Sequence, residues 1–377
     1  MDSTRLRTWG CALSRLIKSS SLGVKCAITY LLSVEKDLSL VHISLNRTQR
    51  IRPFVQSAQV SQRGCSRPLQ RVVTDFGADV PYAQVMDKLV EHYGIVLSES
   101  TITRIAQTHA HRIFEAQKRC DDWPVQAGSA IVIAEMDGGM VPIVQTDESQ
   151  LDRRKGKVLL WKEAKLCLAH AQGSCTPVYG GTLQGDVAEA GKQLFACAVD
   201  AGFGHQSRLH AVGDGASWIA AQVEEQFGDN GRYLVDFYHV CEYLNDAAQV
   251  IVSKSQVETW MDEQKELLKT QGALPVIEAL HPHLEAPTVP EPDAPVRRCH
   301  RYLSQRIPQL EYQGALAQGL PIGSGEIESA HRYIVQQRLK RSGAWWRVDH
   351  ADHMLALRLN RANGRWSDYW AAKKQAA

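Results

Sequence analysis

Three carboxylates from distant parts of the chain have the residue types and settings that phosphoryl transfer requires. Asp137 follows an apolar run that begins at Ile131, and Asp214 follows another short apolar run. The third is either Glu326 or Glu328, at the start of a late helix. Carboxylate oxygens are the hard ligands that Mg²⁺ prefers. Two such ions about 4 Å apart can activate an attacking oxygen and stabilise a leaving oxygen. Each position alone is ordinary, and only their combination indicates this chemistry.

The stretch Arg208–Trp218 gives the clearest setting. Its apolar residues predict a buried strand, and Asp214 follows between Gly213 and Gly215. Open α/β sheets expose reactive groups at the carboxyl ends of their strands. Glycines on both sides of Asp214 would let an ion and a phosphate approach closely, and Ser217 can cap the next helix. The alternative is a tight strand-to-helix turn with a capping aspartate.

Glu326 and Glu328 compete for the third carboxylate position. Ser324 can cap the helix that they open, which places Glu326 in the first turn, where a carboxylate complements the helix dipole. Glu328 lies about 200° further round the helix, on the side of Arg332 and Val335. A carboxylate on the inward side of a helix is costly unless it is paired or binds a metal. We therefore expect Glu328 in the site.

The segments around these aspartates predict a mixed sheet with helices on both faces. We expect three antiparallel strands, then a helix, a strand, a helix and a strand, at residues 130–139, 140–144, 157–169, 186–201, 208–214, 218–227 and 232–238. Residues 140–144 would return as a hairpin, and Tyr179-Gly180-Gly181 would be a loop. This is the element order of a ribonuclease-H-like α/β fold. Residues 126–240 would form its first part, with Asp137 and Asp214 at strand ends.

The region before this core predicts a helical unit. Residues 66–125 contain three short helical segments, with Gly94 ending the second and Ser98 capping the third. This pattern fits a helix-turn-helix-like DNA-binding unit, and an ordinary small helical bundle fits it as well. The exposed face of the third helix would carry four polar side chains: Ser100, Thr103, Arg104 and Gln107.

The sequence after residue 240 predicts that an insertion interrupts the core and that the chain then returns to it. Residues 241–317 form a helical insertion with a Pro-rich loop, residues 318–345 add the glutamate helix, and residues 346–377 form a basic tail that contains tryptophans. Trp345-Trp346 could stack on a base or close the domain as a packed pair. Three basic residues could hold DNA phosphates or form a solvated face: Arg338, Lys340 and Arg341.

Charge is distributed unevenly along the chain. The net charge is only +2, but residues 1–75 carry 12 basic and 4 acidic side chains, and residues 331–377 carry 10 and 3. Basic ends around an acidic middle suit a polyanion held by its flanks, although a solvated acidic surface explains the middle equally well. We expect residues 1–65 to be a basic, poorly ordered arm.

Cysteine usage and hydropathy favour a soluble, cytoplasmic protein. The nine cysteines include no C-x-x-C pair, which argues for reduced thiols instead of disulfides or a zinc site. The apolar stretch 22–34 is interrupted by Lys25 and is too short to span a bilayer. It also lacks the clean apolar core of a signal peptide.

Taken together, the motifs resemble those of bacterial insertion-sequence transposases of the DDE type, in the Mutator-like ISKra group. The resemblance extends from about Pro68 to Trp370, and residues 1–65 lie outside it. Six segments carry it: Glu135–Gly138, Gly213–Ile219, Asp236–His239, Ile322–Ala330, Arg338–Lys340 and Gly343–Trp346.

This resemblance implies a ribonuclease-H-like catalytic core with a helical insertion ahead of the glutamate. It implies that Asp137, Asp214 and Glu328 are the catalytic residues and bind two Mg²⁺ ions, for which Mn²⁺ can substitute. Asp236 and His239 match an Asp-x-x-His element that lies near the active site. His239 could orient DNA, shuttle a proton or make a structural hydrogen bond.

We therefore expect a cytoplasmic, nucleoid-associated transposase that acts as a homo-oligomer. It would cleave and join double-stranded DNA at the terminal inverted repeats of a mobile element and at a target, without a membrane partner. A DNA-binding regulator, or an inactive domesticated remnant, would need only residues 68–125 and a basic surface, and leaves the carboxylates unexplained. A structure-selective nuclease explains the carboxylates but needs no unit that recognises element ends. Strand joining, as opposed to hydrolysis, separates a transposase from the nuclease.

Overall fold

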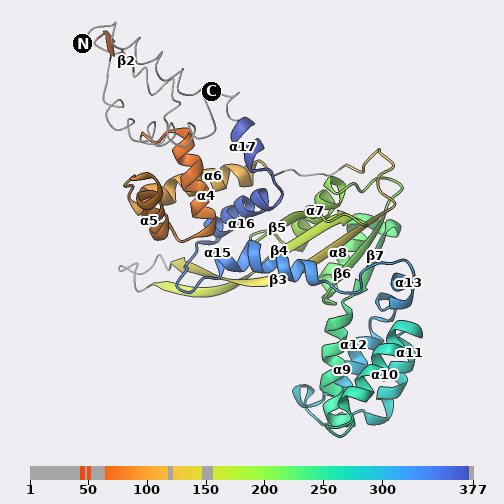
Figure 1. The fold of residues 1–377 in the computed structure, drawn as a ribbon. Coiled ribbons are helices and arrows are strands. Elements are labelled where there is room, and N and C mark those ends of the chain that lie inside the picture. Colours follow the sequence, from red (N-terminus) through yellow and green to blue (C-terminus); the bar gives the residue numbers. More distant parts are fainter. Residues whose placement is uncertain (1–42, 47–48, 52–63, 118–121, 147–155, 373–377) are drawn as a thin grey trace. The chain divides into compact units, whose positions relative to one another are not determined.

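The computed structural model describes most of the 377-residue chain: residues 43–46, 49–51, 64–117, 122–146 and 156–372. The chain forms two compact units, one of residues 1–115 with 365–377 and one of residues 116–364. The predicted arm, 1–65, lies almost entirely outside the described residues. Its described part includes a pair of antiparallel strands, β1 (Ile43–Asn46) and β2 (Gln49–Ile51) (Figure 1).

The first unit contains three consecutive helices and one from the end of the chain: α4 (Arg67–Asp79), α5 (Tyr82–Tyr93), α6 (Glu99–Glu115) and α17 (Trp366–Ala372). Apolar side chains of α4, α5 and α6 form one core. Gly94 ends α5 in the left-handed conformation, with φ 63°. Ser98 Oγ accepts a hydrogen bond from the Thr101 amide at 3.3 Å, at the start of α6. The three helices and both of these end signals agree with the sequence.

The second unit is built on a five-stranded mixed sheet with the order β5-β4-β3-β6-β7. Its strands are β3 (Ile131–Thr146), β4 (Lys157–Ala171), β5 (Val178–Thr182), β6 (Arg208–Gly213) and β7 (Gly231–Val235). β3, β4 and β5 pair antiparallel, whereas β6 pairs parallel to both β3 and β7. The α/β class and the mixed sheet are confirmed.

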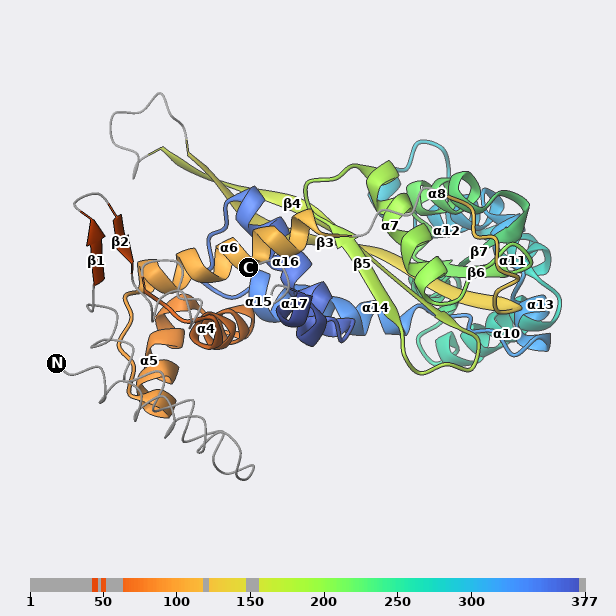
Figure 2. The ribbon, with the colours of Figure 1, turned by 90° about the horizontal axis from the view of Figure 1, so that it is seen from above.

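Two strand predictions are wrong. Residues 140–144 do not return as a hairpin, because β3 runs unbroken through Gly138 and Gly139 in a ladder with β4. β4 is the returning strand, and the two continue as a long ribbon beyond the other strands (Figure 2). The expected loop at 179–181 is the third strand, β5, because Gly180 and Gly181 pair with Cys167 and Leu166. Asp137 therefore lies inside a strand and not at its end.

Helices cover both faces of the sheet. Val132, Ala134 and Met136 of β3 pack with side chains of α7 (Val187–Asp200) and α8 (Ser217–Phe227). Because side chains alternate along a strand, Glu135 and Asp137 point to the opposite face. There the segment at α14 (Gly325–Ala330) contacts β3.

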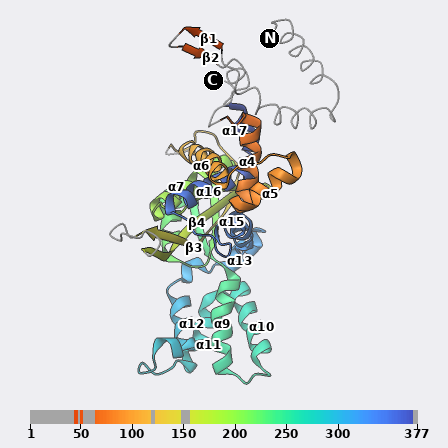
Figure 3. The ribbon, with the colours of Figure 1, turned by 90° about the vertical axis from the view of Figure 1, so that its left-hand side faces the viewer.

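The insertion predicted at 241–317 is helical. It contains most of α9 (Phe237–Ile251), followed by α10 (Val257–Thr270), α11 (Ala273–Leu280), α12 (Pro295–Ser304) and α13 (Tyr312–Ala317). The Pro-rich part forms short 3-10 turns between α11 and α12. These helices share one apolar core, which also includes Val212, Leu234 and Val235 from the ends of β6 and β7. Figures 1 and 3 show them as a helical layer of their own beside the sheet.

After α14 the chain continues through a π-helical turn, η5 (His331–Gln336), and α15 (Gln337–Leu339) to α16 (Val348–Ala362). Residues 346–364 are not a tail. Most of the central part of α16 is buried, and the Asp352 carboxylate accepts hydrogen bonds from the Leu183 and Gln184 amides at 2.9 and 3.2 Å, just after β5. Among the described residues, no helix combines the length and apolar character needed to cross a bilayer.

Candidate active site

Asp137 and Asp214 lie at the same level of the sheet. The parallel pairing of β3 and β6 runs from Ile131↔Arg208 to Glu135↔Val212. Asp137 and Asp214 are separated by the same 77 residues as each of these pairs, so they continue the register just past the point where β6 ends. Asp137 points to the face that carries α14, and Asp214 lies in the turn just after β6, near enough to act on the Asp137 carboxyl.

Asp137 is the electrostatic centre of this region. Burial raises the pKa of its carboxyl, and the nearby carboxylates of Asp214 and Glu328 raise it further. The His331 ring and the Gly138 amide, which donates to Oδ1 at 2.7 Å, act in the opposite direction. Carboxylates from two other parts of the chain thus act on Asp137 through space.

His331 is the histidine in direct contact with Asp137. Its Nε2 lies 3.5 Å from Asp137 Oδ2 and 3.3 Å from the Asp137 carbonyl oxygen. The imidazole is buried against Gly139, where the Cβ of any larger residue would lie 2.8 Å from the ring. The glycine in the middle of β3 is therefore explained by this close approach.

The two glutamates face different partners. Glu328 acts on Asp137, whereas Glu326 acts on Glu135 and lies 3.5 Å from Nε2 of His170 on β4. Both glutamates are exposed, so Glu328 does not occupy the inward position expected from the sequence. Their separation arises because neighbours two apart on a helix point in different directions.

Glu135 fastens the glutamate helix to the sheet. Its buried Oε2 accepts a hydrogen bond from the Ile327 amide at 2.8 Å, in the first turn of α14. Burial raises the pKa of Glu135 to about 8, and the nearby carboxylates of Glu326 and Asp236 contribute to this rise. Ser324 makes no capping hydrogen bond to α14, contrary to the prediction, so a strand carboxylate takes that place.

Asp236 fastens the segment just before that helix. Its Oδ1 accepts from the Tyr238 and His239 amides at 2.6 and 3.1 Å and so caps α9. Its Oδ2 accepts from the amide and the hydroxyl of Ser324 at 2.6 and 2.5 Å. Asp236 is buried, and its carboxylate is used entirely within the protein. This geometry makes it a positioning residue.

The glycines around Asp214 make room for protein hydroxyls. The Gly215 amide donates to Tyr233 Oη at 2.9 Å, and Tyr302 Oη donates to the Asp214 carbonyl at 2.8 Å. A Cβ on Gly215 would lie 2.1 Å from Tyr302 Oη, and Gly215 has a φ of 86°. Asp214 Oδ1 also accepts from the Ala216 amide at 2.8 Å, as expected of a turn residue. Ser217 makes no cap to α8, because Ala216 holds that position.

The three carboxylates fit a divalent cation in the chemistry of their donors. Asp137, Asp214 and Glu328 offer only hard oxygen ligands, which is the preference of Mg²⁺ and Mn²⁺. Within the described ranges, no group of three or more His, Cys, Asp or Glu side chains lies close enough to hold a metal ion. The three carboxylates therefore match a divalent cation in donor type, but the structure does not bring them together as a metal site.

The predicted DNA-contacting residues have mixed settings. On α6, Arg104 and Gln107 are half-buried, and Gln107 donates to Tyr82 Oη at 2.9 Å, so of the expected exposed face only Ser100 is exposed. Arg338 is buried, with its guanidinium 4.6 Å from the Trp346 ring, which does not suit a phosphate contact. Lys340 is exposed and Arg341 is half-buried.

The two adjacent tryptophans are not a packed pair. Trp346 is buried, and its carbonyl accepts from the Val144 amide at 2.7 Å, which fastens it to β3. Trp345 is 62% exposed, and Lys157 Nζ lies 5.3 Å from its ring. Trp346 is thus buried without Trp345 as its partner, and the base-stacking alternative stays a prediction for the exposed Trp345.

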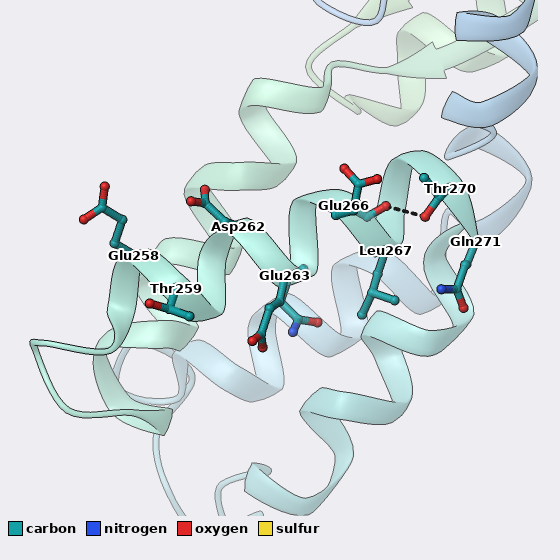
Figure 4. A pocket seen from close by; sticks show the side chains of 9 residues that line it. Glu258, Thr259, Asp262, Glu263, Glu266, Leu267, Thr270 and Gln271 are labelled. Atoms are coloured by element: carbon teal, nitrogen blue, oxygen red, sulfur yellow. Dashed lines mark hydrogen bonds between the residues drawn. The ribbon is translucent and has the colours of Figure 1, made fainter.

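A groove of about 760 Å³ lies along α10. Figure 4 shows that acidic side chains dominate it: Glu258, Asp262, Glu263 and Glu266. Like charges of this density repel a polyanion. This groove is therefore unsuited to DNA.

Sequence reasoning missed Glu135 and His331. Glu135 precedes Asp137 by two positions, so the period of a strand places both on one face. His331 follows Glu328 by three positions, which places both on one side of a helix. These spacings were present in the sequence, but they indicate a shared site only because α14 contacts β3 in the fold.

Comparison with known proteins adds no family. No family model matches the chain. No curated protein matches it either.

Proposed function

We propose that this chain is a Mg²⁺-dependent DNA transposase of the DDE type from a bacterial insertion sequence. It acts on double-stranded DNA as a homo-oligomer. The observation that supports this most is that the carboxylates of Asp214 and Glu328 both lie near enough to Asp137 to raise the pKa of its carboxyl, while β3 and β6 pair in parallel beside them. The order β5-β4-β3-β6-β7, with a helical insertion before the glutamate helix, supports a ribonuclease-H-like core.

The residues divide into two roles. Asp137, Asp214 and Glu328 would hold the divalent cations, which supply charge stabilisation to the attacking and leaving oxygens of a phosphodiester. Glu135 and Asp236 hold the segment that leads to Glu328, so that its carboxylate stays near Asp137. The helices α4–α6 would act as a helix-turn-helix-like unit that binds element ends.

The test is cleavage and joining of a DNA duplex taken from the sequence that flanks the gene, with Mg²⁺, Mn²⁺ or a chelator. Asp137→Asn, Asp214→Asn and Glu328→Gln should each reduce cleavage by about 1,000-fold, since cation contacts are worth several kcal/mol. DNA binding in chelator should persist in all three variants. Glu326→Gln is the matched control, because it makes the same change two residues away and should leave cleavage nearly unchanged.

Three outcomes decide between the functions. Joined products support a transposase, and hydrolysis alone supports a nuclease. Binding without any cleavage supports a regulator or an inactive remnant. Cleavage that survives Glu328→Gln and fails with Glu326→Gln would show that the third carboxylate is wrongly assigned.

A further inference from the structure

A cavity of about 370 Å³ lies beside Asp214, between the β6–α8 turn and the helices α9 and α12. Arg298, Arg301 and Arg306 line it together with His239. Among the described residues that line it, Asp214 is the one acidic side chain. Three guanidinium groups around a small cavity make a setting for an anion.

The sequence of α12 explains why two of these arginines, Arg298 and Arg301, face the cavity. Val296, Cys299 and Leu303 are buried in the core of the insertion. Arg298 and Arg301 lie three positions apart and so share another side of the helix. The helix therefore anchors in the insertion on one side and presents positive charge toward Asp214 on the other.

Arg298 and Arg301 can exchange their present partners for a ligand, whereas Arg306 is fixed by the protein backbone. Arg298 pairs with Asp246 at 3.0 Å and Arg301 with Glu291 at 2.5 Å, but both acids are partly exposed, at 56% and 42%. Exposed ion pairs contribute little to stability and can exchange their anion. Arg306 forms no ion pair with a carboxylate in the part of the chain that the structure describes. Its Nε and Nη1 donate to the carbonyls of Gly215 and Tyr302.

The floor of the cavity is connected to Asp214. The Tyr302 ring is held between Tyr243, stacked at 4.1 Å and 14°, and the Arg306 guanidinium, at 4.1 Å. Its hydroxyl donates to the Asp214 carbonyl at 2.8 Å. Both faces of this ring are therefore covered within the protein, which leaves no surface on it for a base. The arrangement suits a phosphate instead.

We propose that this cavity binds a phosphate group of the DNA strand that reaches Asp214. The proposal rests on the proposed function for the identity of the strand, and it adds the place where the insertion holds it. A phosphate between Arg298, Arg301 and Arg306 would lie next to the candidate active site, because Asp214 belongs both to that site and to the lining of the cavity.

The test measures binding of a short labelled oligonucleotide by the full chain in chelator, over a range of salt concentrations. Replacing Arg298 and Arg301 together by glutamine should weaken binding about 10-fold and lower the slope of log K against log salt by about 1, the loss of one phosphate contact. Arg232→Gln is the matched control, because Arg232 is an exposed arginine on β7 of the same unit and should leave the slope unchanged.

A second pair of variants tests the same cavity in the opposite direction. Asp246→Asn and Glu291→Gln release the two arginines and should tighten binding several-fold. Glu263→Gln in the α10 groove removes the same charge elsewhere in the insertion and should have a much smaller effect. These variants keep Arg298 and Arg301, so they also guard against a folding defect.

The outcomes separate this proposal from the function. A wild-type chain that does not bind the oligonucleotide overturns the proposed function. If the wild-type chain binds the oligonucleotide and the Arg298/Arg301 double variant binds it no more weakly than Arg232→Gln does, then the phosphate site in the cavity is overturned and the proposed function is not. Inorganic phosphate is the second probe: if it binds the cavity but does not compete with DNA there, the ligand is a free phosphate and the DNA assignment is wrong.

Discussion

Replacing Asp236 by asparagine should release the segment that carries Glu328 without changing Glu328 itself. The buried carboxylate accepts four hydrogen bonds, two from the start of α9 and two from Ser324. In Asp236→Asn, one oxygen can still cap α9. The new amide group faces the Ser324 N–H, so one donor opposes another.

The cost follows from that geometry. A buried N–H left without an acceptor costs about 1–3 kcal/mol, and hydrogen bonds to a charged group are worth more than those to a neutral one. We therefore expect Asp236→Asn to lower the free energy of unfolding by about 2–4 kcal/mol. Ser324→Ala removes only the hydroxyl and should cost about 1 kcal/mol. Asp186→Asn makes the same change at the exposed cap of α7 and should cost only a few tenths, because Asn and Asp cap helices equally well.

Three measurements check this prediction. Urea denaturation gives the free energy of unfolding, and amide hydrogen exchange over residues 322–328 reports whether the segment has loosened. Mg²⁺-dependent DNA cleavage by Asp236→Asn should fall about 100-fold, since a misplacement of about 1 Å at a reacting group can cost that much. If Asp236→Asn is as stable as Asp186→Asn and its exchange over 322–328 is unchanged, then Asp236 does not hold this segment.

Three further predictions concern stability. In chelator, the contribution of Glu135 to the free energy of unfolding should fall as pH rises from 4.5 to about 8, because the unfolded chain releases the Glu135 proton at lower pH than the folded chain does. Glu135→Gln should therefore flatten the pH dependence of the urea midpoint. The control Glu266→Gln, at an exposed position, should leave that pH dependence unchanged. Asp352→Ala should lower the free energy of unfolding in urea by about 2–5 kcal/mol, because two amide donors after β5 lose their acceptor; a cost under 1 kcal/mol would contradict this. Gly215→Ala should lower the melting temperature more than Gly319→Ala, since both have positive φ but only Gly215 lies against a tyrosine hydroxyl; equal effects would refute the contact.

The sheet could be predicted wherever local pattern and pairing agree. The apolar run of β6 and its flanking glycines indicated a strand, a turn and a helix, and the structure has all three. Gly138-Gly139 was misinterpreted because glycines usually weaken a strand. Here the ladder with β4 continues through them, and the ring of His331 uses the space. Such a partner, distant along the chain, leaves no trace in the local sequence.

The candidate carboxylates could be chosen from the sequence, but their burial and hydrogen bonds could not. Asp137, Asp214 and Glu328 stood out through their neighbours, and in the structure Asp214 and Glu328 both act on the Asp137 carboxyl without forming a group of three that could hold a metal ion within the described residues. Asp236 carried the same kind of signal, yet it is buried and used up by internal hydrogen bonds. Arg338 was expected on a basic face, whereas it is buried against Trp346. Residue type predicts chemistry, but burial decides whether the group is available, and burial depends on the tertiary fold.

The helical insertion contacts the candidate site in two places, at its own two ends and through α12. Its two ends meet at the sheet, because the Phe237 amide donates to the Ile322 carbonyl at 2.8 Å and Asp236 binds Ser324. The long excursion between these residues therefore need not disturb the position of Glu328. Within the excursion, α12 returns to the sheet and holds the Asp214 turn through Tyr302. One carboxylate thus depends on the ends of the insertion and another on its middle, so a change in α12 should affect Asp214 first and leave the Glu328 segment in place.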